Sequence, residues 1–127
     1  MLVRDVMRKT VSVQAEETLD VAALRLKQEN VGALPVVEAD RIAGMITDRD
    51  LLLRGPAGGR SMKHTKVREV MSVGAVACHD TDDLDHALEL MRCNRIHRLA
   101  VLNGNEKLVG VLSSQLQNSS GAQEFPF

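Results

Sequence analysis

The chain repeats itself, and this internal repeat constrains its fold more than any other feature of the sequence. Residues 3–7, which read VRDVM, return as VREVM at residues 67–71. Further positions recur about 65 residues later, namely Val11 as Val76, Leu19 as Leu84, Asp20 as Asp85, Ala22 as Ala87, Leu34 as Leu99 and Val36 as Val101. Half of a 127-residue chain is marginally stable alone, so the two halves are expected to fold as a pair.

Each half changes its hydrophobic period in the same order. An alternating strand precedes a helix that has Thr18 as its N-cap, or Asp83 in the second half, and whose apolar residues lie on one face. Two apolar strands separated by a polar turn come next, and a further helix begins near Asp48 and ends at Gly55-Pro56. The expected strands are residues 10–13, 34–37, 42–46, 99–102 and 108–112.

This order predicts a β-α-β-β-α unit that occurs twice, and therefore an α/β fold of the α+β type. Because each unit has too few helices to cover its sheet, the units are expected to pack sheet to sheet with pseudo-twofold symmetry. A cleft between two similar halves is a natural ligand position. The predicted boundaries are repeat 1 at 1–55, a linker at 56–65, repeat 2 at 66–116 and a disordered tail at 117–127.

Composition excludes several classes of function. Phe125 and Phe127 are the only aromatic residues, so residues 1–124 have no ring on which a nucleic acid base can stack. The net charge of −1 provides no basic field for DNA, and nucleic acid is not an expected partner. The sequence has no apolar run of about 18 residues and has charges where a signal peptide needs apolar residues. We therefore expect no membrane contact and a cytoplasmic location.

Three weaker patterns lead to negative expectations. No nucleophile motif, P-loop or carboxylate pair is found, so the chain is not expected to be an enzyme. Cys78, His79 and Asp80 are adjacent, but the sequence supplies no fourth ligand and no metal is expected. The basic residues between 49 and 68 are interpreted as a solvated linker, with a docking patch for an acidic partner or for phosphate as the alternative.

The most informative segment is residues 44–51, where an apolar strand ends in Thr47-x-x-Asp50 and passes into a helix. This spacing is typical of a capping box, in which the hydroxyl and the carboxylate bind free N–H groups at the start of a helix. A carboxylate placed there can also accept hydrogen bonds from two vicinal hydroxyls, as the acidic residue of dinucleotide-binding folds does. The residues alone leave both interpretations open.

The motifs VRDVM, GALPVV and GMITDRDLL, followed by VREVM, IHRLAV and LVGVLS, resemble the cystathionine-β-synthase (CBS) domain, and two in tandem resemble a Bateman module. The resemblance covers residues 3–116. It implies a regulatory module that binds AMP, ADP, ATP or S-adenosylmethionine between its repeats and requires no cofactor. It also implies that Asp50 holds the ribose hydroxyls and that Thr47 lies beside the ribose or the phosphate.

The same resemblance suggests the remaining ligand contacts. In related modules, a His-Arg pair of the second repeat reaches phosphates bound by the first, and the match here is His97-Arg98, for which a solvated turn is the alternative. Arg49 is a less specific candidate, since an exposed helix face also explains it. The residues expected to enclose the base are Thr10, Val11, Ala33 and Pro35.

Repeat 2 departs from the family pattern. Leu116 stands where repeat 1 has Asp50, and Ala100 stands where repeat 1 has Pro35. We therefore expect one competent adenosine site. The resemblance also implies a homodimer, which is usual in this family, and a protein target that the sequence does not identify. The alternative function is a protein-interaction or structural module whose ligand site is vestigial.

Overall fold

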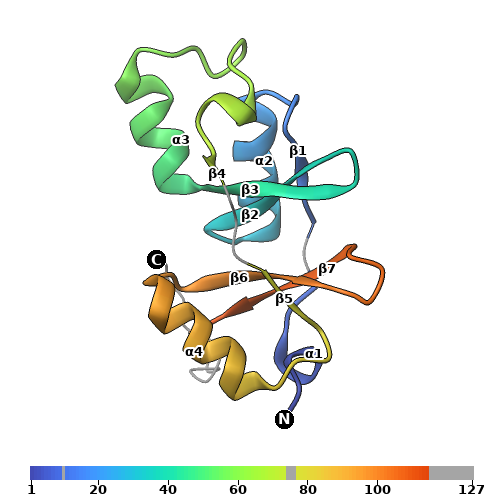
Figure 1. The fold of residues 1–127 in the computed structure, drawn as a ribbon. Coiled ribbons are helices and arrows are strands. Elements are labelled where there is room, and N and C mark those ends of the chain that lie inside the picture. Colours follow the sequence, from blue (N-terminus) through green and yellow to red (C-terminus); the bar gives the residue numbers. More distant parts are fainter. Residues whose placement is uncertain (10, 74–76, 115–127) are drawn as a thin grey trace. The chain divides into compact units, whose positions relative to one another are not determined.

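A computed structural model describes residues 1–9, 11–73 and 77–114 of the chain (Figure 1). The chain divides into two compact units. The repeat-1 unit comprises Val11–Ala75, and the repeat-2 unit comprises Met1–Thr10 together with Val76–Phe127. Each unit combines one β-sheet with helices, which confirms the predicted α/β class.

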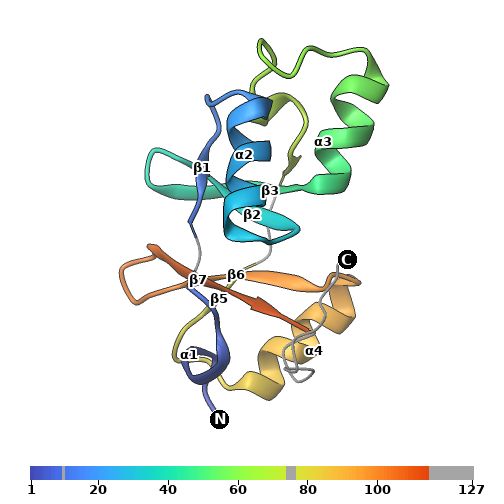
Figure 2. The same ribbon diagram turned by 180° about the vertical axis from the view of Figure 1, so that it is seen from behind.

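The repeat-1 unit contains a four-stranded sheet in the order β1-β2-β3-β4. Strand β1 is parallel to β2, and β3 is antiparallel to both of its neighbours, β2 and β4. Helix α2 lies against one face of this sheet (Figure 2). The elements are β1 Val13–Gln14, α2 Leu19–Glu29, β2 Ala33–Glu38, β3 Arg41–Thr47, α3 Asp48–Arg54, the 3₁₀ helices η1 Pro56–Gly58 and η2 Val67–Glu69, and β4 Ser72–Val73.

The repeat-2 unit contains a three-stranded sheet in the order β5-β6-β7, with β5 parallel to β6 and β7 antiparallel to it. Its elements are α1 Val3–Val6, β5 Ala77–His79, α4 Leu84–Asn94, β6 Arg98–Leu102 and β7 Leu108–Ser113. The expected tail at 117–127, like Leu116, lies outside the described residues.

The two long helices bury the apolar faces predicted for them. Leu19, Ala22 and Leu26 of α2 are buried, as are Ala87 and Met91 of α4. The α2 residues join one core with β1, β2 and β3, and the α4 residues join a second core with α1 and the other sheet. Within the described residues, no helix has the length and apolar character needed to cross a bilayer.

The N-termini of these helices are satisfied in a way that the sequence does not reveal. Thr18 and Asp83 occupy the predicted N-cap positions, but neither side chain accepts a hydrogen bond from its helix. Backbone carbonyl groups from distant segments accept hydrogen bonds from these helix N-termini instead. The first N–H of α2 donates to the Thr65 carbonyl at 3.0 Å, and the first N–H of α4 donates to the Met1 carbonyl at 2.8 Å. Tertiary contacts thus replace the side-chain caps.

The two VRDVM-type segments are exchanged between the repeats. The segment at 67–73 begins repeat 2 in sequence, but β4 within it pairs with β3 of the repeat-1 unit. The segment at 2–8 packs in the repeat-2 unit, where Arg8 and Val111 exchange backbone hydrogen bonds of 3.0 and 2.9 Å. The compact units therefore differ from the sequence repeats at 1–55 and 66–116, because each sheet takes its outer segment from the other repeat.

Two glycines allow these exchanged segments to approach. A Cβ atom at Gly44 would lie 2.3 Å from the Ser72 carbonyl oxygen, and one at Gly110 would lie 2.7 Å from the Arg8 carbonyl oxygen. Neither distance is compatible with a side chain. The repeated glycine is thus required for close backbone contact rather than for a turn.

Candidate functional site

The end of β3 and the start of β2 lie together at one end of the repeat-1 sheet. Ala33 pairs with Thr47, and Pro35 pairs with Met45 in the β2/β3 register. The Asp48 N–H donates to the carbonyl oxygen preceding Ala33 at 3.0 Å and so fixes the start of α3 against β2. The structure thereby brings three of the predicted site residues, Ala33, Pro35 and Thr47, to the N-terminus of α3.

Thr47 and Asp50 form the capping box expected from their spacing. The Asp50 N–H donates to Thr47 Oγ1 at 2.9 Å, and the Thr47 N–H donates to Asp50 Oδ2 at 3.1 Å. Among the described residues, no hydrogen bond to the other carboxylate oxygen, Oδ1, is found. Asp50 is half-buried, so Oδ1 remains available as an acceptor on an oriented carboxylate.

Ser72 joins this carboxylate from the exchanged segment. Its hydroxyl donates to Asp50 Oδ2 at 3.4 Å. Arg54, at the other end of α3, donates to the carbonyl oxygens of Val70 and Met71 at 3.2 and 3.4 Å. Both contacts hold the segment leading into β4 against the α3 helix that carries Asp50.

The basic side chains of residues 49–68 differ in what they contact. Arg49 is exposed on α3. Arg60 donates to the Arg54 carbonyl at 3.1 Å, and Lys66 and Arg68 form ion pairs with Glu16 at 2.7 and 3.0 Å. Several basic side chains of the 49–68 segment therefore stabilise the local fold, which favours the linker interpretation over a docking patch.

The residues expected around the base are found in two environments. Ala33 and Pro35 are buried in β2, whereas Val11 is 38% exposed just before β1. Thr10 lies outside the described residues. Because β1 is parallel to β2, with Val13 opposite Val36, the chain at residue 11 runs alongside the start of β2.

His97 and Arg98 belong to the repeat-2 unit. His97 is exposed and Arg98 is half-buried at the start of β6, where it pairs with Ser113 of β7. The Ser114 N–H donates to the His97 carbonyl at 2.9 Å. Asp50 therefore lies in the repeat-1 unit, and His97 and Arg98 lie in the repeat-2 unit.

The Cys78-His79-Asp80 sequence does not form a metal-binding group. Burial raises the pKa of the Cys78 thiol to about 11, and the negative charge of Asp82 contributes. The Glu106 carboxylate, 2.7 Å from His79 Nε2, raises the pKa of that imidazole. Across the described ranges, no three His, Cys, Asp or Glu side chains are arranged to hold a metal ion.

Comparison with known families identifies the fold. The CBS domain matches this chain twice, at residues 3–55 and 67–115. The chain belongs to the CBS domain family. Both matches begin with a VRDVM-type segment and cover all the strands and α-helices described above.

Relatives of this CBS domain protein are similar along most of its length. The CBS domain-containing protein YhcV of Bacillus subtilis is 40% identical over 125 residues, which covers 93% of this chain and 88% of the relative. A CBS domain protein from Pyrobaculum aerophilum, solved in complex with AMP, is 25% identical with a TM-score of 0.81, and the match covers 91% of this chain and 88% of that chain.

A third similar structure is that of Hypoxic Response Protein I with two coordinated zinc ions. It is 26% identical with a TM-score of 0.83, and the match covers 94% of this chain and 98% of that chain. A relative of that name from Mycobacterium tuberculosis is 30% identical over 112 residues.

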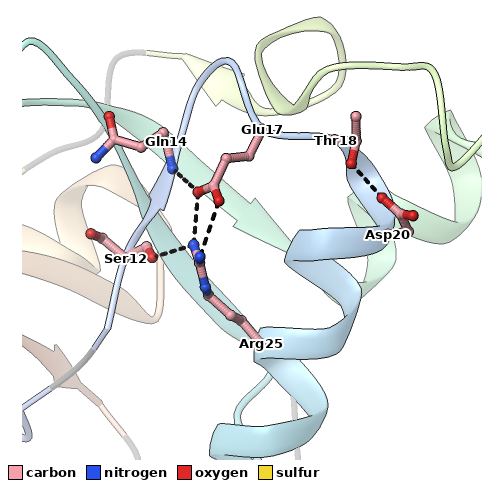
Figure 3. Close-up of polar contacts among 6 residues, drawn as sticks. All are labelled: Ser12, Gln14, Glu17, Thr18, Asp20 and Arg25. Carbon is pink, nitrogen blue, oxygen red and sulfur yellow. Dashed lines mark hydrogen bonds and ion pairs between the residues drawn. The ribbon is translucent and has the colours of Figure 1, made fainter.

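Sequence reasoning missed two residues of this CBS pair, one that contacts Asp50 and one that contacts the chain next to Val11. Ser72 reaches Asp50 only because the segment at 67–73 is exchanged, and the sequence does not reveal which repeat that segment joins. Arg25 donates to the Ser12 carbonyl at 3.0 Å, one residue from Val11 (Figure 3). The sequence did contain a sign that Arg25 has a role specific to repeat 1, because the equivalent residue of repeat 2 is Leu90.

Proposed function

We propose that this CBS pair is a non-catalytic regulatory module that binds one adenosine-containing ligand and passes the binding event to a protein target. AMP is the first candidate, with ADP, ATP and S-adenosylmethionine as the others. The observation that carries the proposal is the Asp50 carboxylate, which is oriented through Oδ2 while Oδ1 stays available. A carboxylate suits the two vicinal hydroxyls of ribose and repels a phosphate.

The other contacts follow from the chemistry of the ligand. A phosphate needs cations, and His97 and Arg98 of the repeat-2 unit are proposed to supply them, with Arg49 and Thr47 beside the ribose and phosphate. The base is proposed to lie against Thr10, Val11, Ala33 and Pro35. No aromatic residue occurs before Phe125, so aliphatic contacts and backbone hydrogen bonds hold the base in this proposal.

The proposal includes one site per chain rather than two. Leu116 stands where a second ribose-binding carboxylate is needed, and Gly32 and Ala33 stand where a second His-Arg pair is needed. We also propose that the module acts in the cytoplasm as a homodimer, the arrangement expected from its family. The similar P. aerophilum protein, solved with AMP, supports an adenosine ligand.

The alternative is a protein-interaction or structural CBS module with a vestigial ligand site. The observation that favours it is that Asp50 already has a structural role as the capping residue of α3. A capping box stabilises the helix whether or not a ligand is bound.

Isothermal calorimetry and thermal unfolding with AMP test the two functions. A ligand present at 100 times its Kd adds about 2.7 kcal/mol to the free energy of unfolding. If neither AMP nor ADP, ATP or S-adenosylmethionine binds or raises the Tm of the wild-type chain, the regulatory proposal fails and the vestigial site is favoured.

The decisive variant is Asp50→Glu. Glutamate is the usual partner in a capping box, so this variant keeps the cap and the charge but extends the carboxylate by one methylene group. We expect an unchanged Tm without ligand and an AMP affinity at least about tenfold weaker, because the ribose contacts require fixed geometry. Asp48→Asn, in the same helical turn but exposed, is the matched control. Wild-type affinity in Asp50→Glu would show that Asp50 is only a cap.

A further inference from the structure

Strand β1 lies at the open edge of the repeat-1 sheet, and two charged side chains hold its outer side. Arg25 Nη1 donates to the Ser12 carbonyl at 3.0 Å, and the Gln14 N–H donates to Glu17 Oε1 at 2.8 Å. Arg25 and Glu17 also bind each other through two hydrogen bonds of 2.7 and 3.0 Å (Figure 3). We call this group the Arg25–Glu17 clamp.

The clamp is well placed to restrict the backbone. Both side chains are half-buried, with 34% and 28% exposure, and their paired hydrogen bonds have the bidentate geometry that fixes orientation. Arg25 projects from α2, whereas Ser12, Gln14 and Glu17 lie on the segment that precedes this helix. The clamp therefore ties the segment around residues 11–14 to a rigid helix.

Pairing of the first strand with its neighbour begins at different equivalent positions in the two repeats. Strand β5 pairs with β6 from Ala77 onward, opposite Ala100, whereas pairing of β1 with β2 starts one equivalent position later, at Val13. The residue equivalent to Ala100 is Pro35, which has no N–H to donate to a neighbouring strand. The proline thus accounts for the start of the β1/β2 pairing at Val13.

Repeat 2 keeps only half of the clamp. The His79 N–H donates to Asp82 Oδ2 at 2.9 Å, in the same way that Gln14 donates to Glu17. Leu90 occupies the position of Arg25 and cannot donate a hydrogen bond. The guanidinium contact of Arg25 therefore occurs in repeat 1, which also has Pro35 and the proposed ribose-binding carboxylate of Asp50. In repeat 2, the position of Arg25 is occupied by Leu90.

We propose that Arg25 is a positioning residue for base recognition, since it fixes the backbone carbonyl of Ser12, one residue from Val11. This inference rests on the proposed function, in which Val11 and Pro35 contact the base. Arg25 acts through Ser12 and Glu17 and does not touch the ligand. Loss of the clamp is expected to impair discrimination between bases more than it impairs the grip on ribose and phosphate.

The test compares AMP and GMP, which differ only in the base. Arg25→Leu introduces the repeat-2 residue, and Arg25→Lys keeps the charge but not the bidentate fork. Glu16→Gln is the matched control, because it removes ion pairs of the same unit that do not contact residues 11–14. Kd values for both nucleotides and the Tm without ligand are measured for each chain.

We expect the wild-type chain to prefer AMP over GMP at least tenfold, because a site that hydrogen-bonds one base leaves polar groups unpaired with another. Arg25→Leu should reduce this ratio about fivefold or more, with Arg25→Lys intermediate and Glu16→Gln unchanged. If Arg25→Leu fails to fold, Arg25→Lys carries the comparison.

Several outcomes overturn the inference. An unchanged AMP-to-GMP ratio in the Arg25 variants, whether or not the Tm falls, shows a purely structural ion pair. Equal affinity of the wild-type chain for AMP and GMP shows that residues 11–14 do not read the base. Failure of the wild-type chain to bind any adenosine ligand removes the proposed function itself, so the two failures are distinguishable.

Discussion

The hairpins β2/β3 and β6/β7 have the same backbone but different chemistry. In both, the register shifts at equivalent residues, between Val36 and Val37 in one and between Val101 and Leu102 in the other. In both, the first residue after the hairpin donates to the carbonyl before its first strand, at 3.0 and 2.9 Å. The described backbone of repeat 2 thus keeps a strand end of the kind that forms the candidate site in repeat 1.

The side chains at these two strand ends are complementary rather than equivalent. Repeat 1 places Thr47 and the Asp50 carboxylate there, which suit a sugar. Repeat 2 places His97 and Arg98 there, which suit a phosphate. Under the proposed function, the internal repeat preserves one backbone scaffold while repeat 1 supplies the sugar contacts and repeat 2 supplies the phosphate contacts.

The largest expected effect is at the glycines that admit the exchanged segments. Gly44→Ala places a methyl group against the Ser72 carbonyl, so β4 must shift, and we expect a loss of about 3 kcal/mol in the free energy of unfolding. Gly110→Ala should cost less, because its Cβ would lie 2.7 Å rather than 2.3 Å from a carbonyl oxygen. Urea unfolding of both variants measures the difference. A larger loss in Gly110→Ala would contradict this ranking.

A smaller effect on the free energy of unfolding is expected from the buried thiol of Cys78 in repeat 2. The equivalent residue of repeat 1 is Val13, which does not titrate. Burial raises the pKa of Cys78 from 9.0 to about 11, so the neutral thiol is favoured in the folded state. Its contribution to stability is complete below pH 9 and is lost as the pH rises toward 11. That loss is about 2 kcal/mol.

Cys78→Val should remove this part of the alkaline destabilisation and make repeat 2 resemble repeat 1. Urea unfolding at a series of pH values from neutral to alkaline measures it. The exposed Cys93 provides the control, since Cys93→Ser should keep the wild-type profile. Identical profiles for the wild-type and Cys78→Val chains would show that the thiol does not contribute.

The smallest expected effect concerns the residues that end α2 and α4. Asn30 and Arg95 occupy equivalent left-handed positions, with φ of 55° and 56°. Asparagine tolerates this conformation better than arginine, so Arg95→Asn should stabilise the chain by about 0.5 kcal/mol, and Asn30→Arg should do the opposite. The midpoint of urea unfolding is the measurement. Destabilisation by Arg95→Asn would point to a side-chain role for Arg95.

Much of the local structure was predictable because it depends on neighbouring residues. The start of α3 followed from the spacing of Thr47 and Asp50, and its end followed from Gly55-Pro56, both of which the structure confirms. The buried faces of the long helices followed from the spacing of their apolar residues. Contacts between residues in adjacent turns of one helix can be predicted from the spacing of those residues in the sequence.

The rest was not predictable because it depends on segments that are distant in the chain. The predicted strand at 10–13 differs from β1, which begins at Val13, and Pro35 of the neighbouring strand has no N–H to extend this pairing toward its start. The N-caps predicted at Thr18 and Asp83 are replaced by backbone carbonyls from elsewhere in the chain. The exchange of segments could not be predicted from the sequence because VRDVM and VREVM have the same apolar pattern.

The exchange also imposes an order on the folding of a chain that emerges from the ribosome. The N-terminal copy of the segment appears with β3, whereas its own sheet does not exist until residues 77–114 have been made. During that interval the edge of β3 is open, and the copy that belongs there, at 67–73, has not yet been synthesised. The growing chain therefore contains residues 3–8, which have the same apolar pattern, while the β3 edge that pairs with Ser72 and Val73 in the folded protein is still exposed.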